Sequence, residues 1–319
     1  MTIIVLGMPR SGTSLLAKLL LDCGLDFGTL AEMARPHELD NPDGYWENVR
    51  VINLNKAILA VLGGSEVAPP NVSPGWSKDP KMRDLKRKAR DLVADLSGPP
   101  YWGWKDPRTM LTLELWQAVL PDARYAFIFR NPFEVALSFA KRNDYLRQQD
   151  FVGLHHSVML WRLYHEVALP LLPPDRTVFV SYGRLMSDCA AELPRIVEAT
   201  GLPATEGQIV AARQSVKPEL YRNRFPDSLI RESPAAEVVR DIWERLVKLA
   251  GEPEASETSD GEQVRMVRAL FEAAFKHLGS ADDQVEVWRD RAFQLHAYAR
   301  KLETQLGIRP SEQTGLAPK

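Results

Sequence analysis

Residues 3–17 of the chain read IIVLGMPRSGTSLLA. An apolar, β-branched run, a loop with two glycines and a leucine-rich stretch of helical spacing predict a strand, a loop and a helix in succession. Gly7 and Gly12 permit the backbone angles and the close approach that such a loop needs, and a helix beginning near Thr13 points its free N–H groups into the loop. The stretch therefore predicts a loop that binds an anion.

The loop departs from the motif of nucleoside triphosphatases (NTPases). The spacing Gly7-x-x-x-x-Gly12 matches the first half of that motif, but Thr13 stands where the motif has a lysine. A second apolar strand ends at Arg130, where an NTPase has an aspartate that helps to hold magnesium. Thr13 and Arg130 both argue against a nucleotide kinase or NTPase. The alternative that remains in that class is a nucleotide kinase or NTPase with a degenerate loop.

Two further stretches have charged residues at the ends of predicted strands. Residues 101–109 read YWGWKDPRT, an aromatic strand that ends at Lys105 and Asp106. Residues 125–138 read YAFIFRNPFEVALS, in which a proline suited to the first turn of a helix follows the strand and the helix carries Ser138. Because ligands of open α/β folds bind at the carboxyl edge of the sheet, these charges are candidates for one site. A surface salt bridge between Lys105 and Asp106 is the alternative.

These motifs together resemble one enzyme family. The loop Pro-Arg-Ser-Gly-Thr-Ser at residues 9–14 resembles the 5′-phosphosulfate loop of sulfotransferases that use 3′-phosphoadenosine-5′-phosphosulfate (PAPS). Because it contains an arginine, the loop looks most like those of the tyrosylprotein and bacterial carbohydrate-type branches of that family. The Lys-Asp-Pro at residues 105–107 resembles that of the tyrosylprotein enzymes, and Arg130 with Ser138 matches the family's 3′-phosphate pair. The Gly-Tyr-Trp-Glu at residues 44–47 resembles a segment of the bacterial branch.

The resemblance implies a PAPS-dependent sulfotransferase. Such an enzyme moves the sulfuryl group of PAPS to an acceptor hydroxyl, here expected on a sugar or small metabolite, by in-line transfer with a carboxylate general base. The spent cofactor is 3′-phosphoadenosine-5′-phosphate (PAP), and no metal is required. The alternative is a non-catalytic scaffold that keeps the PAPS fold, with Arg130 and Ser138 present but no working base.

The resemblance also assigns the donor site residue by residue. Arg10 and Lys105 contact the sulfuryl and bridging oxygens. The remaining contacts are Pro9, Ser11, Gly12, Thr13 and Ser14 at the 5′-phosphate, Arg130 and Ser138 at the 3′-phosphate, and Tyr182 at the adenine. Glycine and arginine follow Tyr182 where the family has acidic residues, which leaves the adenine contact open. A late basic loop offers Lys217, Arg222 and Arg224, for which cofactor contact and plain solvation weigh equally.

The general base has four candidates. Spacing from the loop makes Glu32 the counterpart of the glutamate in the tyrosylprotein enzymes, whereas the Tyr-Trp-Glu context favours Glu47, our first choice. His37 and Asp106 come next. Sequence alone does not separate them, because it gives no distance to the acceptor.

Strands predicted near residues 3–7, 101–105, 124–129 and 177–181 alternate with helices. This order indicates an α/β fold, a P-loop-like three-layer sandwich with a mainly parallel central sheet and a helical C-terminal appendage. The domains we expect are the PAPS-binding domain at residues 1–233, the helical region at 234–306 and a disordered tail at 307–319. A short heptad seam at residues 285–306 predicts packing on the domain or a homodimer.

The composition indicates which binding partners and which cellular compartment to expect. The 319 residues carry 40 basic and 42 acidic side chains, a formal net charge of −2, which gives no support to a nucleic-acid partner. The basic stretch at residues 79–96 also contains aspartates, and we interpret it as a solvated surface helix. The two cysteines have no metal or redox spacing, and no signal peptide or membrane span is predicted. The expected location is the cytoplasm.

Overall fold

The structure is a computed structural model that describes residues 1–38, 41, 44–146, 153–221, 224–252 and 261–275. Within these residues the centre is a four-stranded sheet in the order β2-β1-β3-β4, and all of its pairings are parallel. The strands are β1 (Thr2–Leu6), β2 (Trp102–Lys105), β3 (Arg124–Phe129) and β4 (Thr177–Ser181). The predicted α/β fold with a parallel sheet is confirmed.

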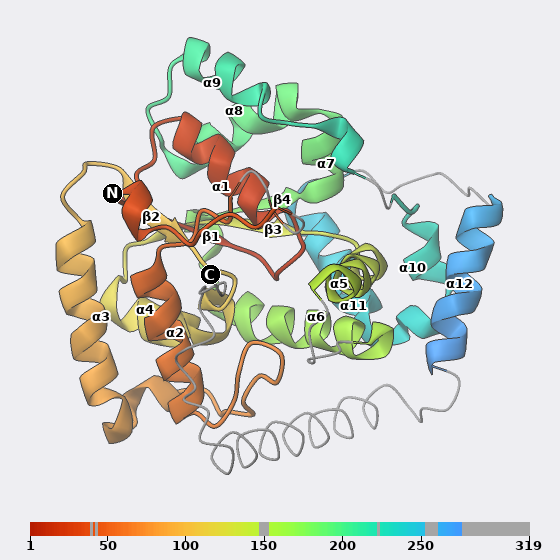
Figure 1. The fold of residues 1–319 in the computed structure, drawn as a ribbon, viewed down its shortest axis with the longest axis horizontal. Helices are drawn as coiled ribbons and strands as arrows, with labels where there is room; N and C mark the ends of the chain where they lie inside the picture. The colour runs from red at the N-terminus through yellow and green to blue at the C-terminus, as the bar shows by residue number, and fades with distance from the viewer. Residues whose placement is uncertain (39–40, 42–43, 147–152, 222–223, 253–260, 276–319) are drawn as a thin grey trace, which may run out of the picture.

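Helices cover both faces of this sheet (Figure 1). One face is covered by α1 (Thr13–Asp22), α7 (Tyr182–Ser187), α8 (Cys189–Thr200) and α9 (Glu206–Arg213). The other is covered by α2 (Val49–Val61), α3 (Arg83–Leu96), α4 (Thr109–Val119), α5 (Pro132–Leu146), α6 (Leu154–Ala168), α10 (Ser228–Glu232), α11 (Glu237–Leu249) and α12 (Glu262–Phe275). Short 3₁₀ turns are formed by Leu30–Glu32, Trp76–Lys78, Pro80–Met82, Leu169–Leu171, Pro174–Arg176, Pro218–Leu220 and Pro234–Ala236.

Strands β1, β3 and β4 contribute to two hydrophobic cores, one on each face of the sheet, and β2 contributes Trp102 and Trp104 to the larger one. Along β1, Ile3 and Val5 pack toward α1 and α8, whereas Ile4 and Leu6 pack toward the larger helical layer. All four side chains are fully buried. A strand buried on both faces needs apolar residues at every position, which explains why the sequence of β1 from Ile3 to Leu6 is a continuous apolar run.

The described C-terminal helices pack on the larger layer through aromatic side chains. The ring of Trp243 on α11 lies 5.5 Å from that of Phe129 at the end of β3, and the ring of Phe271 on α12 lies 4.2 Å from that of Phe133 on α5. These contacts join the described part of the predicted helical appendage to the α/β core. The heptad seam at residues 285–306 and the tail at 307–319 lie outside the described residues.

The strand order determines where a ligand can bind. The chain runs from β1 to β2 on one side and then returns to β3 on the other side of β1, so the order of strands reverses between β1 and β3. In open α/β sheets, ligands bind beyond the carboxyl ends of the strands at such a reversal. The segments that follow Leu6 and Phe129 flank this point.

Candidate functional site

The loop between β1 and α1 has a backbone that few residues can adopt. Gly12 has a φ of 90°, and a Cβ there would lie 2.2 Å from the ring of Tyr182. Arg10 has a φ of 72°, in the left-handed region that is rare for residues with side chains. Such backbone conformations persist where surrounding structure holds them, often at binding sites.

The same loop has the features of an anion site. Helix α1 starts after Gly12 without a side-chain cap, so its first N–H groups point toward the loop with the positive end of the helix dipole. The hydroxyl of Ser11 is buried and has no hydrogen-bond partner. Unpartnered polar atoms are rare in folded proteins, and one in this loop fits a site that is completed by a polar ligand.

The two predicted phosphate motifs meet, although they are more than a hundred residues apart in sequence. Arg10 Nε donates a hydrogen bond to Ser138 Oγ on α5 at 3.0 Å. Arg130, directly after β3, donates from Nη1 to the carbonyl oxygen of Arg10 at 3.3 Å. Both arginines are thus at the reversal between β1 and β3.

Arg130 is enclosed by an acidic residue and two tyrosines. Its Nε donates to Glu134 Oε2 at 2.8 Å. Its Cζ lies 4.5 Å from the ring centroid of Tyr182 and 5.4 Å from that of Tyr221. Burial raises the pKa of Glu134, and Arg130 opposes that rise by stabilising the carboxylate. Burial also raises the pKa of Tyr221, so its hydroxyl stays protonated and can donate.

The late basic loop is only partly described. Lys217 lines a cavity beside α1, and the Cζ of Arg224 lies 5.8 Å from the ring centroid of Tyr221. Arg222 lies outside the described residues. The loop therefore approaches Arg130 through Tyr221, a residue that the sequence analysis did not select.

A second group of charges lies at the end of β2. Lys105 is 1% exposed, and its Nζ donates to Glu47 Oε1 at 2.6 Å. Arg108 Nη1 lies 2.7 Å from Asp106 Oδ1 and 3.7 Å from Glu47 Oε2, and its Nη2 lies 3.2 Å from Glu66 Oε1. The salt bridge considered between Lys105 and Asp106 is not the observed pairing. Lys105 pairs with Glu47, and Asp106 pairs with Arg108.

The candidate bases have different surroundings. The carboxylate of Glu32 accepts from the backbone N–H of Thr29 at 3.0 Å and lies 3.7 Å from Arg50. The Thr29 hydrogen bonds are the main reason that the pKa of Glu32 is lowered. His37 is exposed on the surface. Asp106 is buried and accepts from Asn55 Nδ2 at 2.8 Å as well as from Arg108. Of the four, Glu47 is the one paired with Lys105.

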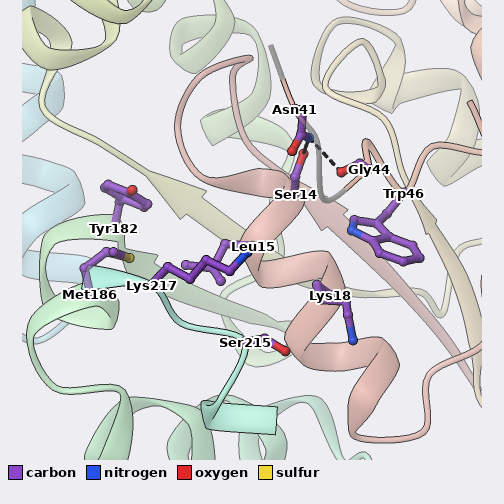
Figure 2. A pocket seen from close by; sticks show the side chains of 10 residues that line it. All are labelled: Ser14, Leu15, Lys18, Asn41, Gly44, Trp46, Tyr182, Met186, Ser215 and Lys217. Carbon is purple, nitrogen blue, oxygen red and sulfur yellow. Dashed lines mark hydrogen bonds between the residues drawn. The ribbon is translucent and has the colours of Figure 1, made fainter. Parts of the chain in front are cut away.

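A cavity of about 240 Å³ opens beside the first turn of α1. Figure 2 shows Tyr182 and Met186 on one side of it and Trp46 on the other. Ser14 lies at its edge, where its Oγ accepts from Asn41 Nδ2 at 3.1 Å. Lys18 and Lys217 add positive charge, although Lys18 also forms an ion pair with Asp22. Flat aromatic walls with cations nearby suit an aromatic, anionic ligand.

Sequence reasoning missed several residues of this site. Glu134 could have been found, because it stands four residues after Arg130 on a predicted helix, the spacing of an ion pair. Arg108 stood three residues from Lys105 and was not selected. Asn41 and Tyr221 lie in irregular segments, where no periodicity indicates the direction of a side chain.

The described residues contain no group of three or more histidine, cysteine, aspartate or glutamate side chains placed to hold a metal ion. Among the same residues, every helix is too short or too polar to cross a lipid bilayer.

The chain was compared with solved structures, curated proteins and protein-family models. Similar solved structures include the sulfotransferase domain from the curacin biosynthetic pathway, 16% identical over 84% of this chain and 96% of that one, with a TM-score of 0.41. The sulfotransferase domain of the Synechococcus PCC 7002 olefin synthase is 18% identical over 88% and 95%, with a TM-score of 0.41. A sulfotransferase from Mycobacterium avium is 17% identical over 86% and 76%, with a TM-score of 0.45. No curated protein matches the sequence.

A protein-family model described as the sulfotransferase family matches residues 2–206, more than half of the chain. The matched region begins with β1 and contains the loop between β1 and α1, Lys105, Arg130 and Tyr182. The chain therefore belongs to the sulfotransferase family.

Proposed function

We propose that this protein transfers a sulfuryl group from PAPS to a hydroxyl group of a sugar or small metabolite. One observation carries the proposal: the loop after β1 and the segment after β3 form two adjoining cationic positions, linked by the Arg10–Ser138 and Arg130–Arg10 hydrogen bonds. PAPS has anionic groups at both its 5′ and 3′ ends, and two adjoining positions match that pattern. Arginine suits both, because its guanidinium recognises phosphate oxygens with two parallel hydrogen bonds.

The chain's own residues fit the donor in three places. The uncapped N-terminus of α1 and the unpartnered hydroxyl of Ser11 suit the 5′-phosphate. Arg130 and Ser138 suit the 3′-phosphate. The cavity between Tyr182 and Trp46 suits the adenine, because its walls are flat and mostly apolar.

When bound, PAPS supplies the sulfuryl group and PAP as the leaving group. Arg10 and Lys105 would hold the sulfuryl and bridging oxygens and stabilise the negative charge that develops on them. A lysine ammonium has three N–H donors, so Lys105 can keep its hydrogen bond to Glu47 and still donate to the donor.

We propose Glu47 as the general base. Its carboxylate lies next to Lys105 and within 3.7 Å of Arg108, and its side chain is 13% exposed. Glu47 would take the hydroxyl proton as the acceptor oxygen bonds to sulfur and the bond to the bridging oxygen breaks.

A transfer assay tests this function. The purified protein is incubated with PAPS labelled on sulfur and a panel of sugars and hydroxyl-bearing metabolites, and labelled products are separated from PAPS. We expect at least one labelled ester and an equal amount of PAP. The Lys105→Met variant should bind PAP and form far less product. Binding of PAP without product from any acceptor would instead support a non-catalytic scaffold.

A further inference from the structure

One buried carboxylate connects Arg130 to Tyr221 and Phe225, far along the chain. Glu134 on α5 is 1% exposed, and its two oxygens have different partners. Oε2 accepts from Arg130 Nε at 2.8 Å. Oε1 accepts from the Tyr221 hydroxyl at 3.1 Å and from the backbone N–H of Phe225 at 2.9 Å. A single side chain thus joins the end of β3 to residues that lie about ninety positions later.

These contacts fix the guanidinium of Arg130 from several directions. Nε is held by Glu134, and Nη1 by the carbonyl oxygen of Arg10. The rings of Tyr182 and Tyr221 lie within cation–π distance of Cζ. The backbone of Arg130 is also held, because its carbonyl oxygen accepts from Trp161 Nε1 at 3.0 Å.

Electrostatics alone does not explain a carboxylate in this position. A negative charge beside a phosphate site repels the phosphate, and its burial costs free energy that an ion pair repays only in good geometry. If Glu134 served phosphate affinity through charge, its removal would strengthen binding. Its arrangement, with every polar contact divided between Arg130 and the Tyr221–Phe225 end, points instead to orientation.

Resting on the proposed function, we propose that Glu134 is a positioning residue that aligns Arg130 on the 3′-phosphate of the donor and ties Tyr221 and Phe225 to the same site. Tyr221 and Phe225 then contribute to nucleotide selection through this carboxylate. The consequence is specific: Glu134 should matter for nucleotides that carry a 3′-phosphate and hardly for those without one.

The test compares PAP with adenosine 5′-phosphate (AMP), which differs from PAP only by the 3′-phosphate, in calorimetric titrations. Glu134→Gln keeps the shape, but its NH₂ group cannot accept a hydrogen bond, so it loses either Arg130 or the Tyr221–Phe225 contacts. We expect PAP affinity to fall about tenfold or more and AMP affinity to change less than about twofold. Tyr221→Phe, which removes one hydroxyl, should show the same selectivity with a loss of about three- to tenfold.

Glu192→Gln is the matched control. Glu192 is also a fully buried glutamate held by arginines, but it lies on α8 and its partners are Arg184 and Arg195, at 2.7 Å each. Its substitution should lower the melting temperature and leave the ratio of PAP to AMP affinities unchanged. If Glu134→Gln does not fold, Tyr221→Phe decides the question, because it removes only the hydroxyl.

The outcomes separate this inference from the proposed function. Wild-type protein that does not bind PAP would contradict the function itself. Wild-type protein that binds PAP, with Glu134→Gln or Tyr221→Phe binding PAP equally or more tightly, would overturn only the positioning role. An equal loss of PAP and AMP affinity would also overturn it, because that pattern marks general damage to the site.

Discussion

At the scale of single residues, the contact between Lys105 and Glu47 brings together two groups with different proposed roles. Lys105 would stabilise charge on the departing side of the sulfur, and Glu47 would remove a proton on the attacking side. Arg108 connects the pair to Asp106 and Glu66. Because all these side chains are largely buried, the electrostatic interactions between them are stronger than they would be in water. A substitution of one therefore affects the others.

The proposed base gives a direct prediction. Glu47→Gln should lower turnover by about 10²–10⁴-fold and leave PAP affinity nearly unchanged, because an amide of the same size cannot take the proton. Turnover is measured with the acceptor found in the transfer assay, and PAP affinity by calorimetry. Glu32→Gln is the control, since its carboxylate is held by Thr29 and Arg50, and we expect turnover within a few-fold of wild type.

If Glu32→Gln abolishes turnover and Glu47→Gln does not, the base is Glu32, as in the tyrosylprotein enzymes. Glu47 would then be a residue that positions Lys105. If neither substitution matters, His37 and Asp106 are tested in the same way.

Sequence patterns reached part of this residue-scale arrangement. The loop at residues 9–14 and the Arg130–Ser138 spacing predicted two anion positions, and the structure brings them into contact. The Lys105–Glu47 pair could not be predicted, because it depends on how the irregular segment before α2 packs against the end of β2. The joint role of Glu134 was hidden for the same reason: its partners Tyr221 and Phe225 are remote in sequence and lie in a segment without periodicity.

At the scale of elements, the strands were the most predictable part of the fold. Each predicted strand lies within two residues of the observed one at both ends, because a strand buried on both faces must be apolar throughout. The first residues of helices were harder to predict. The basic helix expected from residue 79 begins at Arg83, after a 3₁₀ turn at Pro80–Met82 that Asp79 caps. The short helices α7 and α9 were not predicted, since they offer few turns of periodicity.

Helix α6 leads to a prediction about acid stability. His165 is fully buried, stacks on Trp161 with ring centroids 4.0 Å apart, and donates from Nδ1 to the Trp161 carbonyl oxygen. Burial lowers the pKa of His165 from 6.5 to about 4. The folded protein therefore keeps His165 neutral where the unfolded chain binds a proton, so stability is full above pH 6.5 and falls as the pH approaches 4. The loss from this group is about 2 kcal/mol at pH 5.

The measurement is the free energy of unfolding by denaturant at pH 7 and pH 5. His165→Phe cannot bind a proton, so it should lose about 2 kcal/mol less than wild type over this interval, whatever its stability at pH 7. A His165→Phe variant with the same acid loss as wild type would show that other groups cause it.

At the scale of the whole molecule, two helical layers cover the sheet and leave the candidate site at its carboxyl edge. The described C-terminal helices join the larger layer through Trp243 and Phe271. From the heptad spacing we expect residues 285–306 to support a homodimer. Deleting residues 285–319 should then halve the mass measured by light scattering and leave PAP affinity unchanged. An unchanged oligomeric state would assign the seam to packing within one chain.

The proposed function requires a site that binds a nucleotide with a 3′-phosphate and does not need a triphosphate. The most direct test is the melting temperature of the wild-type protein with PAP or with ATP and magnesium at equal concentrations. At about 100 times its dissociation constant, PAP should raise the melting temperature by several degrees, and ATP with magnesium far less. Stabilisation by ATP with magnesium and none by PAP would contradict the proposed function.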